Sequence, residues 1–281
     1  TNGAVSMMEL FNTTTNVISQ GKVRRGSWAA YLPVDHGDIE EFLQVRSEGH
    51  PIQDISMAVC IPNYWMEEMI GGDVKKREIM AKIHKKRSET GYPYIFFTDN
   101  VNDGKPQWYK DQDMEIKHSQ LCAEIMEYTD EDKSFVCCLS SMNLLHYDDW
   151  KGTNAVKVLT NLLEAVYTEF VEKASGVPFL EKAVRFAEDH RSIGVGALGY
   201  HSYLQSKRIP FESLTARLIN KEMFRVIDSE TRSQSEALAE SQGEPAVLKG
   251  YGERFSTRMA IAPTTSSSFI LGQVSPSIEP L

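Results

Sequence analysis

Residues 55–97 decide the fold, because they hold two apolar runs separated by a charged helical stretch. The first run is Ile55-Ser56-Met57-Ala58-Val59-Cys60-Ile61, a short apolar segment typical of a buried strand. Lys75–Thr90 follows as a charged amphipathic helix that ends at Gly91. Tyr92-Pro93-Tyr94-Ile95-Phe96-Phe97 is aromatic and β-branched and predicts a second buried strand. Strand, helix and strand in this order predict an α/β fold with a mainly buried sheet.

The same alternation extends in both directions from this stretch. Apolar patterning predicts further strands at residues 27–34, 192–198 and 258–262. It also predicts helices at residues 3–19, 38–46, 155–190 (with a break near Gly176), 201–207 and 213–242. Residues 98–117 form a polar, turn-rich stretch. Because the sequence contains no internal repeat and no low-complexity linker, we expect one domain over residues 1–281.

Composition narrows the class of protein. The 39 acidic side chains exceed the 30 basic ones, which argues against a surface that coats nucleic acid. No apolar run is long enough to cross a bilayer, and the first residues do not read as a signal peptide. Four cysteines in 281 residues do not indicate a secreted disulfide scaffold. A protein of a reducing cytoplasm, with no membrane or nucleic-acid partner, is expected.

The first stretch that could carry chemistry is Ser119-Gln120-Leu121-Cys122-Ala123-Glu124. In an extended loop, residues two apart project to the same side, so Gln120, Cys122 and Glu124 can converge on one ligand. An amide, a thiol and a carboxylate together offer hydrogen bonding, sulfur chemistry and proton transfer. Taken alone, however, the pattern favours a buried structural cysteine with polar neighbours, since free cysteine is among the most buried residue types.

The second stretch is Phe135-Val136-Cys137-Cys138-Leu139-Ser140-Ser141. If it is a strand, the two adjacent cysteines face opposite sides, and only one of them can point into a site that contains Cys122. Vicinal cysteines rarely bond to each other, because the closure is strained. Two small buried side chains are the structural alternative.

The third stretch is Ala262–Gly272, in which the five hydroxyl residues Thr264-Thr265-Ser266-Ser267-Ser268 follow the predicted strand 258–262 and precede a short helix. Hydroxyls and free backbone N–H groups at a helix start can hold a phosphate without a lysine. A helix cap in a solvated turn explains the same residues equally well.

A metal site is the remaining alternative for the cysteines. The candidate ligands have the spacing His-x3-Cys, followed by a long gap to Cys-Cys, and lack the paired Cys-x2-Cys and His-x3-His knuckles of structural zinc. No metal site is therefore expected. The ligands considered are His118, Cys122, Cys137, Cys138 and His146.

Taken in order, these motifs resemble the large (α) subunit of ribonucleotide reductases, most closely the class I enzymes. The family's finger-loop pattern Ser-Asn-Leu-Cys-x-Glu is matched at residues 119–124, and its Val-Cys-x-Leu-x-Ser segment at residues 136–141. Leu121 beside Cys122 fits class I better than the proline typical of class II. Several weak motifs in the correct order are jointly specific. The other similar stretches are Thr1–Ile39, Arg191–Gly196, Pro263–Ser267 and Ser277–Pro280.

The resemblance implies a ten-stranded α/β barrel of two half-barrels, incomplete in this chain, with Cys122 at the tip of a finger loop inside it. By that analogy Cys122 becomes a thiyl radical that abstracts the 3′-hydrogen of a ribonucleotide, and Glu124 takes the 3′-hydroxyl proton. Gln120 would contact the substrate hydroxyls. Cys137 would be one of two thiols that reduce the 2′ position. Residues 264–268 would hold the substrate's phosphates.

The resemblance also implies partners. The substrate would be a ribonucleoside diphosphate, the radical would come from a metal-containing small subunit rather than from adenosylcobalamin, and thioredoxin or glutaredoxin would restore the thiols. The chain itself would bind no cofactor, and a homodimer is expected. Deoxynucleotide or ATP effectors would bind two specificity loops formed by Val23, Arg24, Arg25 and Gly26 and by Gly49, His50, Gln53 and Asp54.

Several departures from the family pattern set limits on this interpretation. Gln120 replaces the family's Asn, the second redox thiol has no clear counterpart, and Met66–Lys82 is shorter than in typical members. The family's N-terminal ATP cone and C-terminal tail also have no counterpart. We therefore expect a fragment, a split-gene product or a compact variant that needs complementary large-subunit segments. The rival interpretations are a non-catalytic nucleotide-binding or assembly module and a cysteine/histidine metal protein.

Overall fold

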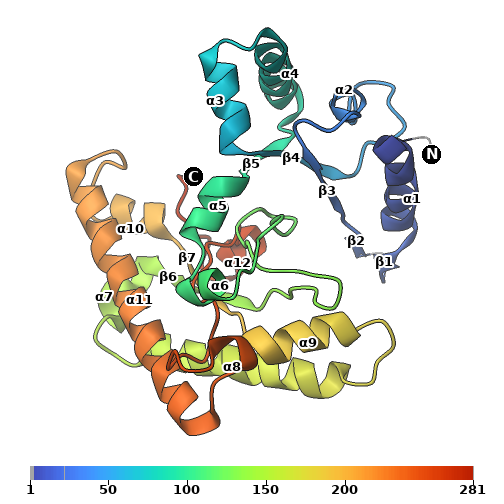
Figure 1. Cartoon of the computed structure of the whole chain (residues 1–281). Helices are drawn as coiled ribbons and strands as arrows, with labels where there is room; N and C mark the ends of the chain where they lie inside the picture. The colour runs from blue at the N-terminus through green and yellow to red at the C-terminus, as the bar shows by residue number, and fades with distance from the viewer. Residues whose placement is uncertain (1–2, 22, 281) are drawn as a thin grey trace. The chain divides into compact units, whose positions relative to one another are not determined.

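The computed structural model describes residues 3–21 and 23–280 (Figure 1). They form two compact units, which are described separately. The first unit comprises Thr1–Lys105 and Ile116–Glu127, and the second comprises Pro106–Glu115 and Tyr128–Leu281. The expectation of one domain over residues 1–281 stays a prediction.

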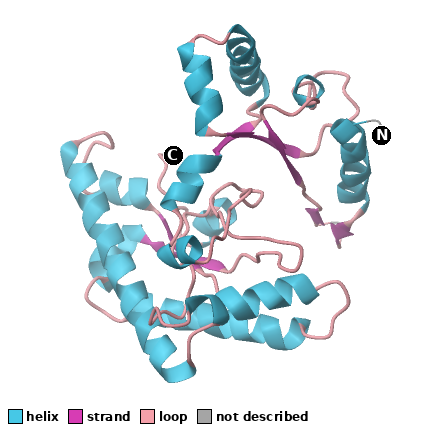
Figure 2. Ribbon diagram, in the orientation of Figure 1, coloured by secondary structure: helices cyan, strands magenta, loops and turns pink. Residues whose placement is uncertain are grey.

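The first unit is built on a parallel sheet of three strands in the order β3-β4-β5 (Figure 2). In this sheet Ala29 of β3 pairs with Ser56 of β4, and Ala58 of β4 pairs with Tyr94 of β5. A short antiparallel hairpin, β1-β2, precedes the sheet. The elements are α1 (Gly3–Val17), β1 (Ser19–Gln20), β2 (Arg24–Arg25), β3 (Ala29–Pro33), α2 (Ile39–Phe42), β4 (Ser56–Ile61), α3 (Asn63–Gly71), α4 (Val74–Thr90), β5 (Tyr94–Phe97) and α5 (Thr98–Gly104).

The two faces of this sheet have different roles. Side chains alternate along a strand, and Leu32 of β3 and Val59 of β4 pack with residues of α1 to α4 in one apolar core. Tyr31, Cys60 and Phe96 occupy the intervening positions and therefore lie on the opposite face. The helices thus cover one face only, and the other face is left for the segment around Cys122.

The second unit contains a two-stranded parallel sheet, β6-β7, in which Leu139 pairs with Gly194. Helices α8 and α9 lie side by side, and the long helix α11 packs across α8 (Figure 1). The elements are α6 (Gln107–Asp111), β6 (Leu139–Asn143), η1 (Leu144–His146), α7 (Tyr147–Trp150), α8 (Ala155–Ala174), α9 (Glu181–His190), β7 (Gly194–Leu198), α10 (Tyr200–Ser206), α11 (Leu214–Gln242), η2 (Ala246–Leu248) and α12 (Thr265–Ile270).

The prediction of an α/β fold is confirmed, and the predicted central strands and the long helices occur within a few residues of their expected bounds. Some local predictions differ from the structure. Residues 98–117, expected as turns, contain α5 and α6, because Asn102 bonds both the N–H and the carbonyl of Ile116 and fixes this segment. Helix α3 was not predicted.

The expected strand at Arg258–Ala262 is also absent, and a single parallel bridge joins Val195 to Met259. This segment nevertheless lies close against β7. A Cβ at Gly194 would come within 2.7 Å of the Ala260 Cβ, and one at Gly196 would collide with the Ala260 carbonyl oxygen. Glycine is required at both positions, because only a residue without a Cβ lets the segment at Ala260 come this close. The described strands, β1 to β7, form no closed barrel.

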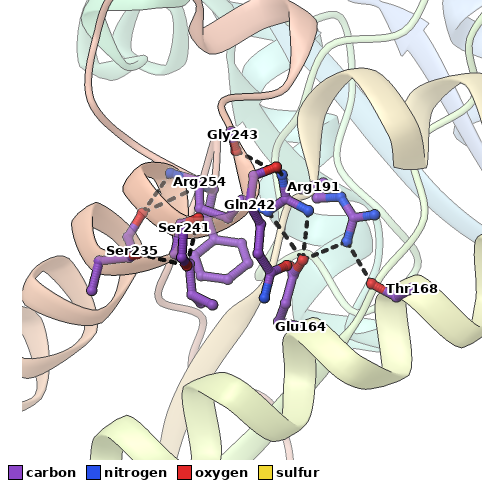
Figure 3. Close-up of polar contacts among 11 residues, drawn as sticks. Glu164, Thr168, Arg191, Ser235, Ser241, Gln242, Gly243 and Arg254 are labelled. Carbon is purple, nitrogen blue, oxygen red and sulfur yellow. Dashed lines mark hydrogen bonds and ion pairs between the residues drawn. The ribbon is translucent and has the colours of Figure 1, made fainter.

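A buried carboxylate joins three segments of the second unit (Figure 3). Glu164 of α8 is 4% exposed, and its Oε1 accepts hydrogen bonds from Arg191 Nη1 at 2.7 Å and from Arg254 Nη2 at 2.7 Å. Arg191 also donates to Thr168, and Arg254 to the carbonyl of Gly243. The network therefore ties α8 to the residue that follows α9 and to the chain that follows α11.

This network predicts a large effect of removing its acid. Glu164→Ala would leave the buried Arg254 and the partly buried Arg191 without their carboxylate, and we expect a loss of about 3–5 kcal/mol in the free energy of unfolding. The measurement is urea unfolding of the chain followed by circular dichroism. Glu169→Ala, which removes the exposed partner of Lys173 on the same helix, is the control and should change stability little. Equal losses in both variants would contradict the argument.

Candidate active site

Cys122 lies at the tip of a tight hairpin. Ser119 bridges Met126 in antiparallel fashion, and the Gln120 N–H donates to the Ile125 carbonyl at 3.0 Å. The Ala123 N–H donates to the Gln120 carbonyl, also at 3.0 Å, and so closes a turn with Cys122 at a central position. Cys122 is exposed. We name residues 119–126 the Cys122 hairpin.

The expectation of an extended loop at this place is wrong. The chain turns through the left-handed region at Ala123, whose φ is 66°, so the alternation of an extended strand does not apply. Gln120, Cys122 and Glu124 nevertheless lie in one hairpin of eight residues. The prediction that these three residues form a site therefore stays a prediction, although they share one hairpin.

The polar atoms of the hairpin differ in whether they have hydrogen-bond partners. The Gln120 Oε1 accepts a hydrogen bond from the Ile125 N–H at 2.8 Å, whereas its Nε2 is buried and has no partner in the described part of the chain. One oxygen of Glu124 is likewise buried without a partner there. The hairpin therefore holds one amide donor and one carboxylate oxygen that are not used by the described residues.

The hairpin is attached to β3 at its base. The Tyr31 hydroxyl bonds the Ser119 hydroxyl and lies 3.3 Å from the Gln120 backbone carbonyl oxygen. The Tyr31 ring also makes an edge contact with Phe96, at a centroid distance of 6.0 Å. The helix-free face of the first sheet thus carries the hairpin.

In the second unit, Cys137 and Cys138 lie just before β6 and have different surroundings. Cys137 is exposed, whereas Cys138 is partly buried and its thiol faces the Leu163 carbonyl at 3.7 Å. Burial, with a smaller contribution from the Glu164 charge, raises the pKa of the Cys138 thiol to about 11. Burial likewise raises the pKa of Cys60 to about 11. Both thiols are therefore protonated at neutral pH.

An apolar cavity of about 440 Å³ adjoins the two cysteines within the second unit. Its walls are residues 136–140 on one side and one face of α8 on the other, including Leu162, Val166 and Phe170.

The hydroxyl-rich stretch is a helix and not a loop before one. Residues 265–268 lie inside α12, at its start, so the prediction that the hydroxyl residues form a loop before the helix is wrong. Ser268 is buried and donates to the Thr265 carbonyl, and Thr264 accepts from the Ser277 N–H. Ser266 and Ser267 are exposed. The backbone N–H groups in a first helical turn have no intrahelical partner. Ser266 and Ser267 are thus the hydroxyls best placed to meet a ligand.

Both predicted effector loops lie in the first unit and both contact α1 or the residue after it. The Gly26 N–H donates to the Ile18 carbonyl at 3.1 Å, and the Asp54 N–H donates to Asn12 Oδ1 at 3.4 Å. Val23 is 93% exposed, and Arg25 is exposed. The side chain of Arg24 lies outside the described residues.

The second of these loops is held by its own side chains. Gln53 donates to the carbonyls of Ser47 and His50, and the His50 ring accepts from the Ile52 N–H. Gly49 turns the chain at a φ of 80°.

Residues 3–21 and 23–280 contain no group of three His, Cys, Asp or Glu side chains that could hold a metal ion. Within the same residues, no helix combines the length and the apolar character that a bilayer span needs.

Comparison with known proteins decides the family. The family model described as the ribonucleotide reductase barrel domain matches residues 1–73 and 69–247. The chain belongs to the ribonucleotide reductase barrel family. The resemblance stated from the motifs is therefore confirmed. The two matched stretches meet inside Met66–Lys82, the region identified as shorter than in typical members.

Individual relatives agree with this assignment. The chain is 36% identical to the putative ribonucleoside-diphosphate reductase large subunit of Frog virus 3 and 31% identical to the large subunit of Invertebrate iridescent virus 3, each over 99% of its length. It covers 53% and 56% of those proteins. The solved class Id ribonucleotide reductase α subunit of Actinobacillus ureae matches the whole chain with a TM-score of 0.96 and 49% identity. The chain covers 53% of that subunit, so it spans about half the length of these reductase subunits.

Sequence reasoning missed Tyr31 and the base of the hairpin. Tyr31 was part of a predicted strand, and nothing in a single strand shows which distant loop its hydroxyl meets, 88 residues away. The alternation of β3 does show that Tyr31 faces away from Ala30 and Leu32. That signal could have placed it on the site face, although not on Ser119.

The contrast between adjacent cysteines can be measured. Because the thiolate is the nucleophile, the buried, high-pKa thiol of Cys138 should react with iodoacetamide at about pH 8 far more slowly than Cys137. The pKa of the Cys138 thiol is higher in the folded protein than in the unfolded chain, so the neutral thiol stabilises the fold at neutral pH. This stabilisation is lost as the pH rises toward about 11, and the protection of Cys138 from iodoacetamide should fall in the same pH range. Mass spectrometry of the labelled peptide measures both rates. Equal labelling at about pH 8 would contradict the assignment.

Proposed function

We propose that this chain is the catalytic core segment of a ribonucleotide reductase large subunit, which reduces ribonucleoside diphosphates to deoxyribonucleotides in the cytoplasm. The observation that carries the proposal is the Cys122 hairpin, which presents an exposed thiol two residues before a carboxylate with an unused buried oxygen. An exposed thiol on a tight turn is accessible to a substrate. Family membership supplies the reaction class.

In the proposed reaction, Cys122 carries the radical and abstracts the 3′-hydrogen of the ribose, which forms an S–H bond and leaves a carbon radical at C3′. Glu124 accepts the 3′-hydroxyl proton as a general base. Water leaves from the 2′ position. Cys137 and a second thiol supply the proton for that water and the hydrogen that replaces the hydroxyl at C2′, and their two-electron oxidation forms a disulfide, which thioredoxin or glutaredoxin reduces. Cys122 then returns a hydrogen atom to C3′ and regains its radical. The second thiol is not assigned to a residue of this chain.

Phosphate binding is proposed for Thr264–Ser268. Ser266 and Ser267 support it, because their exposed hydroxyls lie in the first turn of α12, where backbone N–H groups also have no intrahelical partner. The close contact of β7 with Ala260, a few residues earlier, fixes the chain that leads into this helix. Deoxynucleotide or ATP effectors are proposed for the loops at residues 23–26 and 49–54.

The complete enzyme is proposed to contain more than this chain. Parallel sheets β3-β4-β5 and β6-β7 would be parts of the two halves of a ten-stranded barrel, with complementary large-subunit segments supplying the other strands. A metal-containing small subunit would generate the radical. A homodimer of the large subunit is part of the same proposal.

One observation favours a second candidate, a nucleotide-binding or assembly segment without catalytic function. The side-chain amide oxygen of Gln120, Oε1, accepts a hydrogen bond from the Ile125 N–H of its own hairpin. It is therefore not available to a substrate unless the hairpin rearranges.

Removal of the Cys122 thiol separates the two candidates. In the complete enzyme with its radical-generating subunit, Cys122→Ser should abolish deoxynucleotide formation, because a serine hydroxyl does not replace a thiyl radical. The assay measures deoxyribonucleotide by chromatography. Cys138→Ser, which keeps a donor for the Leu163 carbonyl, is the control and should retain activity. Unchanged product formation by Cys122→Ser would remove Cys122 from the mechanism and leave the binding function.

A binding measurement tests the phosphate residues. If Ser266 and Ser267 hold phosphate, a nucleoside diphosphate binds more tightly than its nucleoside. The double variant Ser266→Ala/Ser267→Ala should narrow that gap by about 100-fold or more, since hydrogen bonds to charged groups contribute about 1.5–3 kcal/mol each. Calorimetric titration gives both affinities. The matched control is Ser229→Ala/Ser241→Ala, which removes two exposed hydroxyls of α11. An unchanged gap would count against this site.

A further inference from the structure

We propose that Tyr31 is a positioning residue for Cys122, acting through a hydrogen-bond relay from its hydroxyl to Ser119 and on to the Gln120 carbonyl. These hydrogen bonds attach the turn around Cys122 to the paired strands of the first unit. The catalytic consequence of the relay rests on the proposed function, whereas its effect on the hairpin does not.

The direction of the relay follows from the donors present. The Ser119 hydroxyl donates to the Gln120 carbonyl at 2.9 Å, so in its contact with Tyr31 it accepts and the tyrosine donates. Tyr31 also lies 3.3 Å from the same carbonyl. The Gln120 carbonyl in addition accepts the Ala123 N–H that closes the turn. One oxygen therefore joins the turn around Cys122 to the tyrosine of β3.

The tyrosine is well suited to act as a fixed support. It lies on β3, which is paired in a parallel sheet, and its ring contacts Phe96 edge-on and His118 at a centroid distance of 5.7 Å. Ser119 is only 4% exposed, so water has little access to the middle of the relay. Burial raises the pKa of Tyr31, which keeps its hydroxyl protonated and able to donate throughout the neutral range.

The expected consequence concerns geometry more than stability. Tyr31→Phe keeps the ring contacts and leaves the Ser119 hydroxyl bonded to Gln120, so the unit should fold. The turn, however, loses its link to the sheet and gains freedom at the position of the sulfur. Misplacement of a reacting atom by about 1 Å can cost about 100-fold in rate. We therefore expect a lower kcat with an unchanged KM, because Tyr31 contacts the hairpin and not the nucleotide.

The first arm of the test measures the hairpin alone. Amide hydrogen exchange of residues 119–126 should be about fivefold to tenfold faster in Tyr31→Phe, the effect of one hydrogen bond. Tyr64→Phe is the matched control, since it removes a tyrosine hydroxyl that bonds Asp35 elsewhere in the same unit, and it should leave the hairpin unchanged. Ser119→Ala should also speed exchange. The double variant should be no faster than Ser119→Ala, because both changes break one chain of bonds.

The second arm measures steady-state kinetics of the complete enzyme carrying the same variants. Faster hairpin exchange together with a kcat lowered about tenfold or more, at constant KM, supports the positioning role. Unchanged exchange in Tyr31→Phe, or additive effects in the double variant, overturns the relay whatever the activity. Faster exchange with unchanged kcat overturns its role in the reaction. If the unmodified enzyme forms no deoxynucleotide, the proposed function fails, and the exchange arm still decides the relay.

Discussion

The structure of the first unit depends on one constraint: a parallel sheet has two faces, and helices α1 to α4 of this unit pack against one of them. Leu32 and Val59 are buried in a helix-covered core, and alternation along the strands sends Tyr31 and Phe96 to the other face. A face without helices must be covered by another segment, because parallel strands are rarely exposed to water. The Cys122 hairpin takes that place, so burial of the sheet and placement of the thiol have the same cause.

The second unit depends instead on a buried charge. Glu164 accepts hydrogen bonds from Arg191 and Arg254, which stand at the start of the segment into β7 and shortly before the chain that leads to α12. Burying one carboxylate obliges the fold to bring both guanidinium groups to it, since an unpaired buried charge is costly. The same network thus fixes the strand beside the cysteine pair and the approach to the proposed phosphate residues.

The four cysteines illustrate how environment assigns roles that residue type cannot. Burial raises the pKa values of Cys60 and Cys138 to about 11 and keeps both thiols protonated at neutral pH. Cys122 and Cys137 are exposed. Cys137 and Cys138 are adjacent in the sequence and nevertheless differ in exposure. In a family whose chemistry depends on thiols, this division separates the proposed reactive sulfurs from the structural ones.

The sequence by itself determined the family, the α/β class and the residues of the Cys122 hairpin, because ordered motifs and apolar periodicity are local properties of the chain. It could not determine that Ala123 turns the chain, that residues 264–268 are helical, or that Arg258–Ala262 forms no regular strand. Those outcomes depend on contacts with distant residues, such as Ala260 against Gly196. Only the tertiary structure brought Tyr31 to Ser119, because a hydrogen bond across 88 residues leaves no periodic trace in the sequence.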